Sequence, residues 1–119
     1  MGLGGAVGSL LRWFVEVLLL AGPGTVPWGT LAVNVLGSAA LGAVVVVLDS
    51  GVGSTVDRAF LTTGLLGGFT TFSTYATQVA LLGSAAPVLA LTYLAVTPLL
   101  CVAAAGLAAT VARQLWRTR

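Results

Sequence analysis

The feature that most constrains this chain is the length of its stretches without a charged residue. No charge interrupts the 32 residues between Glu16 and Asp49, or the 54 residues between Arg58 and Arg113. As one continuous helix, at about 1.5 Å per residue, the second stretch would be roughly 80 Å long. The apolar core of a bilayer is only about 30 Å thick, so we expect this stretch to cross a membrane more than once.

The composition excludes other classes of protein. Of the 119 residues, 58% are hydrophobic and 7% are charged, so a soluble domain could not cover its surface with polar groups. The net charge of +2 is too small for a nucleic-acid surface. The chain has no His, no pair of carboxylates in one segment and no nucleophile beside a plausible base, so we also expect no enzymatic activity.

Gly and Pro residues divide the chain into four apolar segments. The apolar runs are continuous, whereas the strands of a membrane barrel alternate between apolar and polar residues. The sequence therefore predicts an all-α membrane protein, a single domain over residues 1–119, with four transmembrane helices. We place these helices near residues 3–21, 28–48, 58–83 and 87–111, each long enough to span a bilayer with some tilt.

The charges of the loops predict the topology. An even number of spans places both termini and the loop at residues 49–57 on the same side of the membrane, and the other two loops carry no charge. By the positive-inside rule, the charged side is cytoplasmic, in a multi-pass protein of the cell membrane. The arginines on this side are Arg58, Arg113, Arg117 and Arg119.

Glycines recur at the spacing of closely packed membrane helices. Gly4 and Gly8 lie four residues apart in the first segment, and Gly64 and Gly68 do so in the third, so helix backbones can approach closely there. Four helices of this length can hardly enclose a pore and also shield their polar side chains from lipid. We therefore expect an oligomer, most simply a dimer with twofold symmetry.

Polar residues inside a spanning segment are costly unless they are paired or face water, so they mark the candidate site. In the third segment, Gly67 and Gly68 precede hydroxyl residues over 69–75 that compete for backbone hydrogen bonds. This composition favours a break in the helix, whose freed carbonyls can bind a cation and whose freed N–H groups can attract an anion. A close-packed Gly/Thr helix interface fits the same spacing equally well.

Two further polar groups each lie on one helix face. Asn34 has Thr30 one turn before it and Ser38 one turn after it, and its amide can donate hydrogen bonds to an anion. The other group is a stripe on the fourth segment that can line a polar track. Both groups also fit ordinary packing or a hydrogen bond between helices. The stripe has a spacing of four residues and consists of Tyr93, Thr97 and Cys101.

Glu16 is the only carboxylate inside a predicted span, and it lies four residues after Arg12. The two side chains are close enough to form an ion pair, and either can instead snorkel to the interface. A small proton-coupled multidrug exporter also uses four short helices in an antiparallel dimer and would need such a carboxylate. This alternative function is disfavoured because Arg12 would hold Glu16 ionised, and because it assigns no role to Asn34.

Three stretches carry a more specific signal. They are Gly-Gly-Ala-Val-Gly-Ser-Leu-Leu-Arg-Trp at 4–13, Gly-Thr-Leu-Ala-Val-Asn-Val-Leu-Gly at 29–37 and Gly-Gly-Phe-Thr-Thr-Phe-Ser-Thr-Tyr at 67–75. In this order, and with four expected helices, they resemble the motifs of the Fluc (CrcB) family of fluoride channels. The resemblance covers essentially the whole chain, and three motifs at the right separations are far more specific than one.

The resemblance implies an antiparallel dimer with two fluoride pores and one structural sodium ion at its centre, which exports fluoride passively. It assigns the sodium ion to the backbone carbonyls of Gly67 and Thr70, whose oxygens suit this ion. For the fluoride pathway it implies an amide donor, two rings with electropositive edges and a polar track. The pathway residues are Asn34, Phe72, Tyr75, Ser73, Thr30, Tyr93 and Thr97, and Arg12 takes a structural or vestibule position.

Two positions depart from the family pattern. Tyr75 stands where phenylalanine is common, and Cys101 continues the stripe where a hydroxyl is more usual. The charge bias of the loops leaves two kinds of dimer open, because an antiparallel homodimer requires insertion in both orientations. The chain either forms a homodimer or pairs with an oppositely oriented homologue, in which case it can be a non-conducting subunit.

Overall fold

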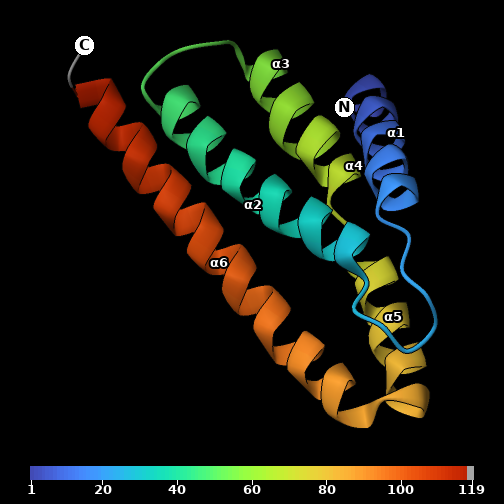
Figure 1. Cartoon of the computed structure of the whole chain (residues 1–119). Helices are drawn as coiled ribbons and strands as arrows, with labels where there is room; N and C mark the ends of the chain where they lie inside the picture. Colours follow the sequence, from blue (N-terminus) through green and yellow to red (C-terminus); the bar gives the residue numbers. More distant parts are fainter. Residues whose placement is uncertain (118–119) are drawn as a thin grey trace.

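The computed structural model describes residues 1–117, so Arg119 lies outside the described residues. Within them the regular structure is entirely helical, as predicted, and the chain runs in four helical segments (Figure 1). Two of the helices, α2 and α6, are long and apolar enough to cross a membrane. The elements are α1 (Gly2–Leu18), α2 (Trp28–Asp49), α3 (Thr55–Arg58), the π-helix η1 (Ala59–Leu66), α4 (Gly67–Phe69), α5 (Phe72–Ala85) and α6 (Pro87–Arg117).

The helix ends differ from the predicted bounds by a few residues. Helix α1 ends at Leu18 rather than near residue 21, and α6 continues to Arg117, beyond the last apolar residues. The third segment starts at Thr55 because Ser54 and Asp57 form a capping box, in which the Ser54 side chain accepts a hydrogen bond from the Asp57 N–H. Hydrogen bonds from the Ser54 backbone and hydroxyl lower the pKa of Asp57.

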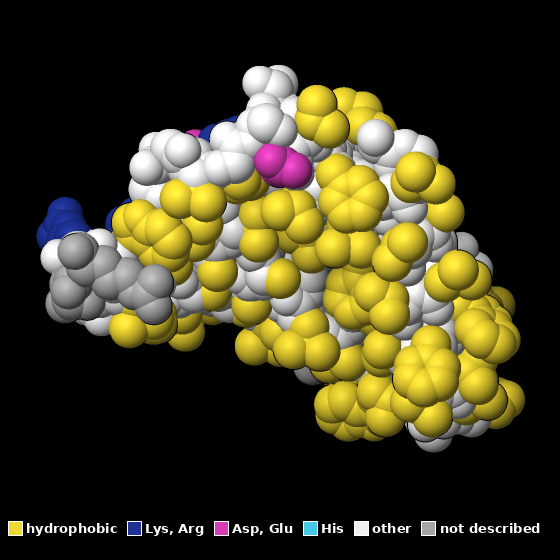
Figure 2. All heavy atoms as spheres, turned by 90° about the horizontal axis from the view of Figure 1, so that it is seen from above, with side chains coloured by type: hydrophobic (Ala, Val, Ile, Leu, Met, Phe, Trp, Pro, Cys, Tyr) yellow, Lys and Arg dark blue, Asp and Glu magenta, His cyan; other side chains and the backbone are white. Residues whose placement is uncertain are grey.

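The distribution of side chains is the reverse of that in a soluble domain. Hydrophobic side chains cover most of the face shown in Figure 2, and basic side chains gather at one end of it. Several polar side chains are instead buried, namely Thr30, Asn34, Thr71 and Thr97. An apolar exterior around a polar interior fits a molecule whose solvent is lipid.

Helix α1 packs against η1 and α4 through glycines. A Cβ atom on Gly4 would lie 2.6 Å from the Phe60 carbonyl oxygen, and one on Gly68 would lie 2.9 Å from the Gly5 Cα atom. A side chain at either position would therefore push the two backbones apart. The close backbone approach predicted for the first and third segments is confirmed, and it holds η1 and α4 in place beside the interrupted part of the third segment.

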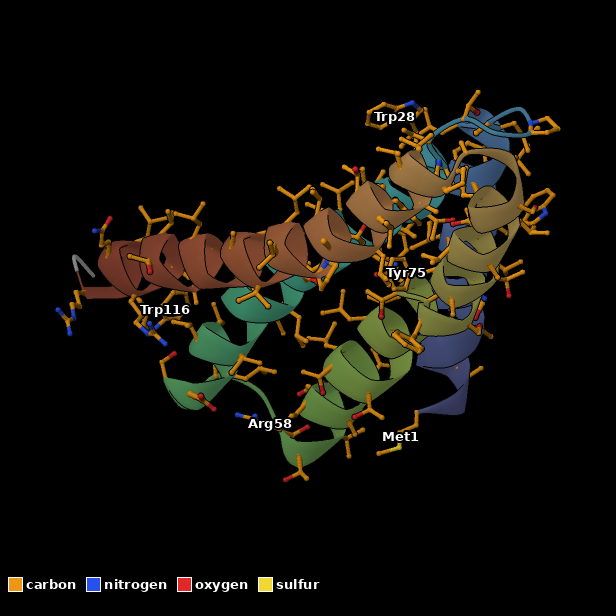
Figure 3. All side chains as sticks on the ribbon, turned by 90° about the horizontal axis from the view of Figure 1, so that it is seen from below. Met1, Trp28, Arg58, Tyr75 and Trp116 are labelled. Atoms are coloured by element: carbon orange, nitrogen blue, oxygen red, sulfur yellow. The ribbon has the colours of Figure 1, made fainter. Side chains whose placement is uncertain are left out.

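Tryptophans bracket the apolar length of the molecule. Trp28 begins α2, Trp116 lies in the last turn of α6, and the two lie at opposite ends of the molecule (Figure 3). Tryptophan favours the interface between lipid and water, so these positions are where two membrane surfaces would lie. Tyr75 lies between them, among the helices, and marks the region of the candidate site.

Candidate functional site

The third segment leaves the helical conformation at two residues. Thr70 and Thr71 have extended backbone angles, with ψ values of 156° and 123°, between the end of α4 and the start of α5. They lie within the 67–75 stretch, where a glycine pair is followed by hydroxyl residues. The Thr70 hydroxyl bonds back to the Leu66 carbonyl at 3.0 Å, and the Thr71 hydroxyl caps α5 by accepting from the Thr74 N–H at 3.2 Å.

The Asn34 side chain binds both backbone groups of Thr71. Its Oδ1 atom accepts a hydrogen bond from the Thr71 N–H at 2.8 Å, and its Nδ2 atom donates to the Thr71 carbonyl at 2.9 Å. Asn34 lies on α2 and is 9% exposed, so these bonds replace the helical bonds that the extended residue lacks. One N–H of the Asn34 amide is not used by Thr71.

These bonds leave two carbonyls without their helical donors. In a continuous helix the Thr71 N–H would bond the Gly67 carbonyl, but it donates to Asn34 instead. The Thr74 N–H would bond the Thr70 carbonyl, but it donates to the Thr71 hydroxyl. The carbonyls of Gly67 and Thr70 are therefore available as oxygen ligands, and they belong to the two residues that the family resemblance assigns to sodium.

Three aromatic rings follow the interruption. The Phe72 and Tyr75 ring centroids are 5.8 Å apart, and those of Tyr75 and Tyr93 are 5.2 Å apart, both with tilted planes. Phe72 is 80% exposed on the subunit, whereas Tyr75 and Tyr93 are buried. Tilted rings present electropositive edges at several angles, which suits contact with an anion.

The Tyr75 hydroxyl has a structural partner on α6. It donates a hydrogen bond to the Leu94 carbonyl at 2.6 Å. The helical donor to that carbonyl would be residue 98, which is proline and has no N–H. The hydroxyl therefore satisfies a carbonyl that Pro98 leaves unpaired, which gives a physical reason for tyrosine at a position where the family pattern has phenylalanine.

We predict that Tyr75→Phe lowers the free energy of unfolding by about 0.5–1.5 kcal/mol, because it removes the part-buried hydrogen bond to the Leu94 carbonyl. In a Pro98→Ala background the cost becomes much smaller, since residue 98 then supplies its own N–H. The free energy of unfolding in detergent is measured for the wild type, for each of the two single variants and for the double variant. If Tyr75→Phe lowered the free energy of unfolding equally in both backgrounds, the Tyr75 hydroxyl would not be replacing the N–H that Pro98 lacks.

A cavity of about 360 Å³ lies beside the interruption, and its lining includes Asn34, Thr71, Phe72 and Tyr75. Thr97 also lines it; this residue is 3% exposed, and its buried hydroxyl oxygen has no hydrogen-bond partner within residues 1–117. A buried hydroxyl without a protein partner is costly, and such groups need an explanation. Here the hydroxyl is a free donor at the edge of a cavity.

A second cavity, of about 560 Å³, is lined by polar groups of three helices. Its lining includes Glu16 on α1, Thr30 on α2, and Thr74 and Gln78 on α5. Gln78 Nε2 donates to the Thr30 hydroxyl oxygen at 2.8 Å, and the Tyr93 hydroxyl donates to Gln78 Oε1 at 3.0 Å. Gln78 is not among the site residues predicted from the sequence, although it is a lone amide in an apolar span, as Asn34 is.

The remaining predicted residues lie apart from these cavities or at their edge. Ser73 is exposed on the subunit, and so is Gly67, which lines the smaller cavity together with the half-buried Cys101. An ion pair between Arg12 and Glu16 is not formed among the described residues. Glu16 turns toward α2 instead, where the Thr30 hydroxyl lies 3.3 Å from its Oε1 atom.

Comparison with a family model identifies the protein family to which these features correspond. Residues 1–109 match the model described as CrcB-like protein, Camphor Resistance (CrcB). Every residue that lines the two cavities lies within this matched stretch.

Named relatives agree with the family model. The chain is 45% identical over 118 residues to the fluoride-specific ion channel FluC 2 of Nocardia farcinica, covering 98% of this chain and 83% of that protein. It is 49% identical over 75 residues to the fluoride-specific ion channel FluC of Agrobacterium fabrum, covering 60% and 59%. It is 44% identical over 97 residues to FluC 2 of Streptomyces avermitilis, covering 80% and 61%.

Proposed function

Since this chain belongs to the CrcB family, we propose that it is one subunit of a fluoride-specific ion channel. The observation that carries the proposal is the interruption at Thr70 and Thr71, which lies beside a cavity where the buried Thr97 hydroxyl has no hydrogen-bond partner among the described residues. Passive flow through the channel exports fluoride that enters cells as its uncharged acid. A membrane channel needs no catalytic residue for this task.

The lining of the 360 Å³ cavity suits a small anion. Fluoride loses strongly bound water on entering a pore, so the pore has to offer donors in its place. The unused amide hydrogen of Asn34, the Thr97 hydroxyl and the edges of the Phe72 and Tyr75 rings are such groups, and none carries a full positive charge. Neutral donors stabilise the ion without holding it too tightly to leave.

We propose that the carbonyls of Gly67 and Thr70 hold a structural sodium ion between two subunits. Both carbonyls have lost their helical donors, and neutral oxygen ligands suit a hard monovalent cation. Gly67 is exposed on the subunit, as expected for a carbonyl that shares its ion with a second chain. The ion would be structural and would not move with fluoride.

If sodium links the subunits, replacing it with N-methylglucamine should shift the purified protein from dimer toward monomer, because the Gly67 and Thr70 carbonyls would lose their common ligand. The mass of the protein–detergent complex, measured by light scattering with and without sodium, reports this shift. Potassium at equal ionic strength is the control for salt effects. Identical dimer fractions in all three buffers would contradict the sodium site.

The partner is proposed to be an oppositely oriented subunit that covers Phe72, an aromatic ring that is 80% exposed beside the interruption. Because Arg58, Arg113 and Arg117 all lie on the side of the termini, we propose cytoplasmic termini in the cell membrane and pairing with an oppositely oriented homologue. The homodimer is the alternative. A C-terminal reporter equally active on both sides of the membrane would favour the homodimer.

Growth tests the function in cells. A bacterial strain without its own fluoride exporter should grow at otherwise inhibitory fluoride concentrations when it makes this chain together with any homologue encoded beside it. Failure to protect, with the protein present in the membrane, would count against a fluoride channel.

A further inference from the structure

Glu16 is a carboxylate that occupies a hydrogen-bond donor of the proposed fluoride pathway. Its Oε1 atom lies 3.3 Å from the hydroxyl oxygen of Thr30, a residue that is 1% exposed. The contact is held by close packing, because a Cβ atom on Gly29 would lie only 2.9 Å from the Glu16 Cα atom. Helices α1 and α2 thus meet at this point, and the carboxylate lies against the first turn of α2.

The neighbouring hydrogen bonds all point toward this carboxylate. The Tyr93 hydroxyl donates to Gln78 Oε1, and Gln78 Nε2 donates to the Thr30 oxygen. An amide nitrogen can only donate, so the Thr30 oxygen is the acceptor in that bond and its single hydrogen is free for Glu16. The chain of donors begins on α6, passes through α5 and α2, and ends at Glu16 on α1.

Fluoride and an ionised carboxylate are both pure acceptors, so only one of them can take the single hydrogen of Thr30 at a time. We propose that Glu16 competes with the permeating fluoride ion for the Thr30 hydroxyl in the 560 Å³ cavity, and thereby raises the fluoride concentration that the channel needs for half-maximal flux. This inference rests on the proposed function. It assigns to Glu16 a role in setting the apparent fluoride affinity, which differs from a pairing with Arg12.

Within residues 1–117, no ion pair cancels the charge of Glu16. The ion pair recorded within residues 1–117 joins Arg58 to Asp49, in the loop region near the termini, and does not include Glu16. Arg12 lies one turn away on the same helix, and the groups that α2 and α5 present to the cavity near Glu16, Thr30 and Gln78, are uncharged. An approaching anion therefore meets both an occupied donor and a negative charge.

Fluoride efflux from liposomes tests the competition, with the rate measured over a range of internal fluoride concentrations. Glu16→Gln keeps the size of the side chain and an acceptor for Thr30 but removes the charge, which makes it a weaker competitor. We expect the fluoride concentration at half-maximal efflux to fall by roughly threefold to tenfold, the effect of one partly screened charge. The difference should shrink as ionic strength is raised.

The matched control is Asp49→Asn, which makes the same change of charge outside both cavities and should leave the half-maximal concentration unchanged. Glu16→Ala is a second variant and should shift the half-maximal concentration in the same direction as Glu16→Gln, since alanine offers no competing acceptor.

If Glu16 had only a structural role, the half-maximal concentration would not change in the glutamine variant. If the wild type conducts fluoride, an unchanged half-maximal concentration in Glu16→Gln would overturn the inference. An equal shift in Asp49→Asn would overturn it as well. A wild type without efflux would instead overturn the proposed function on which it rests.

Discussion

Replacing Asn34 with alanine is expected to abolish fluoride efflux and to lower the free energy of unfolding by about 2–5 kcal/mol, since two buried backbone groups lose their partners. The N–H and the carbonyl of Thr71 both bind the Asn34 side chain. Without the amide, the extended residues have no replacement for the helical bonds that they lack, and the cavity loses its amide donor. Unfolding in detergent and efflux from liposomes measure the two effects separately.

Ser38→Ala is the matched control for this prediction. Ser38 lies one turn after Asn34, lines the same cavity, and makes no hydrogen bond within residues 1–117. We expect its removal to change the free energy of unfolding by less than about 0.5 kcal/mol. Asn34→Asp separates the two functions of the amide, because a carboxylate still accepts from the Thr71 N–H but cannot donate to its carbonyl. If Asn34→Ala were as mild as Ser38→Ala, the amide would not be what holds the interruption.

Phe72→Ile is expected to abolish fluoride efflux while leaving the protein folded and assembled. The ring is 80% exposed on the subunit, so its loss creates no cavity within the subunit. What is lost is the electropositive ring edge beside Tyr75, at 5.8 Å between centroids, which isoleucine cannot replace. The measurement is the initial rate of efflux from liposomes that contain equal amounts of wild type and variant.

Phe14→Ile is the matched control, because it removes an exposed ring that lies away from the proposed site. Phe14 lies on α1, is 55% exposed, and does not line either cavity. Its replacement should leave the rate of efflux unchanged. Full efflux through Phe72→Ile, with the dimer intact, would remove this ring from the pathway.

The sequence predicts the helical fold well because the physics behind that prediction is simple. Stretches of 32 and 54 residues without a charge leave few structures other than membrane helices. The ends of the helices are less predictable, since they depend on local bonds such as the capping box of Ser54 and Asp57. The end of α6 at Arg117 depends on residues beyond the apolar run, where hydropathy no longer indicates whether a helix continues.

The candidate site is only partly predictable, because sequence spacing shows which face a residue lies on but not what it contacts. Asn34 and Thr71 are 37 residues apart, so the sequence left open whether the amide binds an anion or another helix. The bond from Tyr75 to the carbonyl that Pro98 leaves unpaired likewise requires knowing that α5 and α6 meet there. Gln78 could have been found from the sequence alone, as a lone amide in an apolar span.

The most direct test of the account is the release of fluoride and of chloride from liposomes that contain the purified chain, alone and together with an oppositely oriented homologue. We expect rapid fluoride release in at least one of these preparations, chloride release no faster than from empty liposomes, and loss of the fluoride signal in Phe72→Ile. Fluoride release no faster than from empty liposomes in both preparations, or chloride release as fast as that of fluoride, would contradict it.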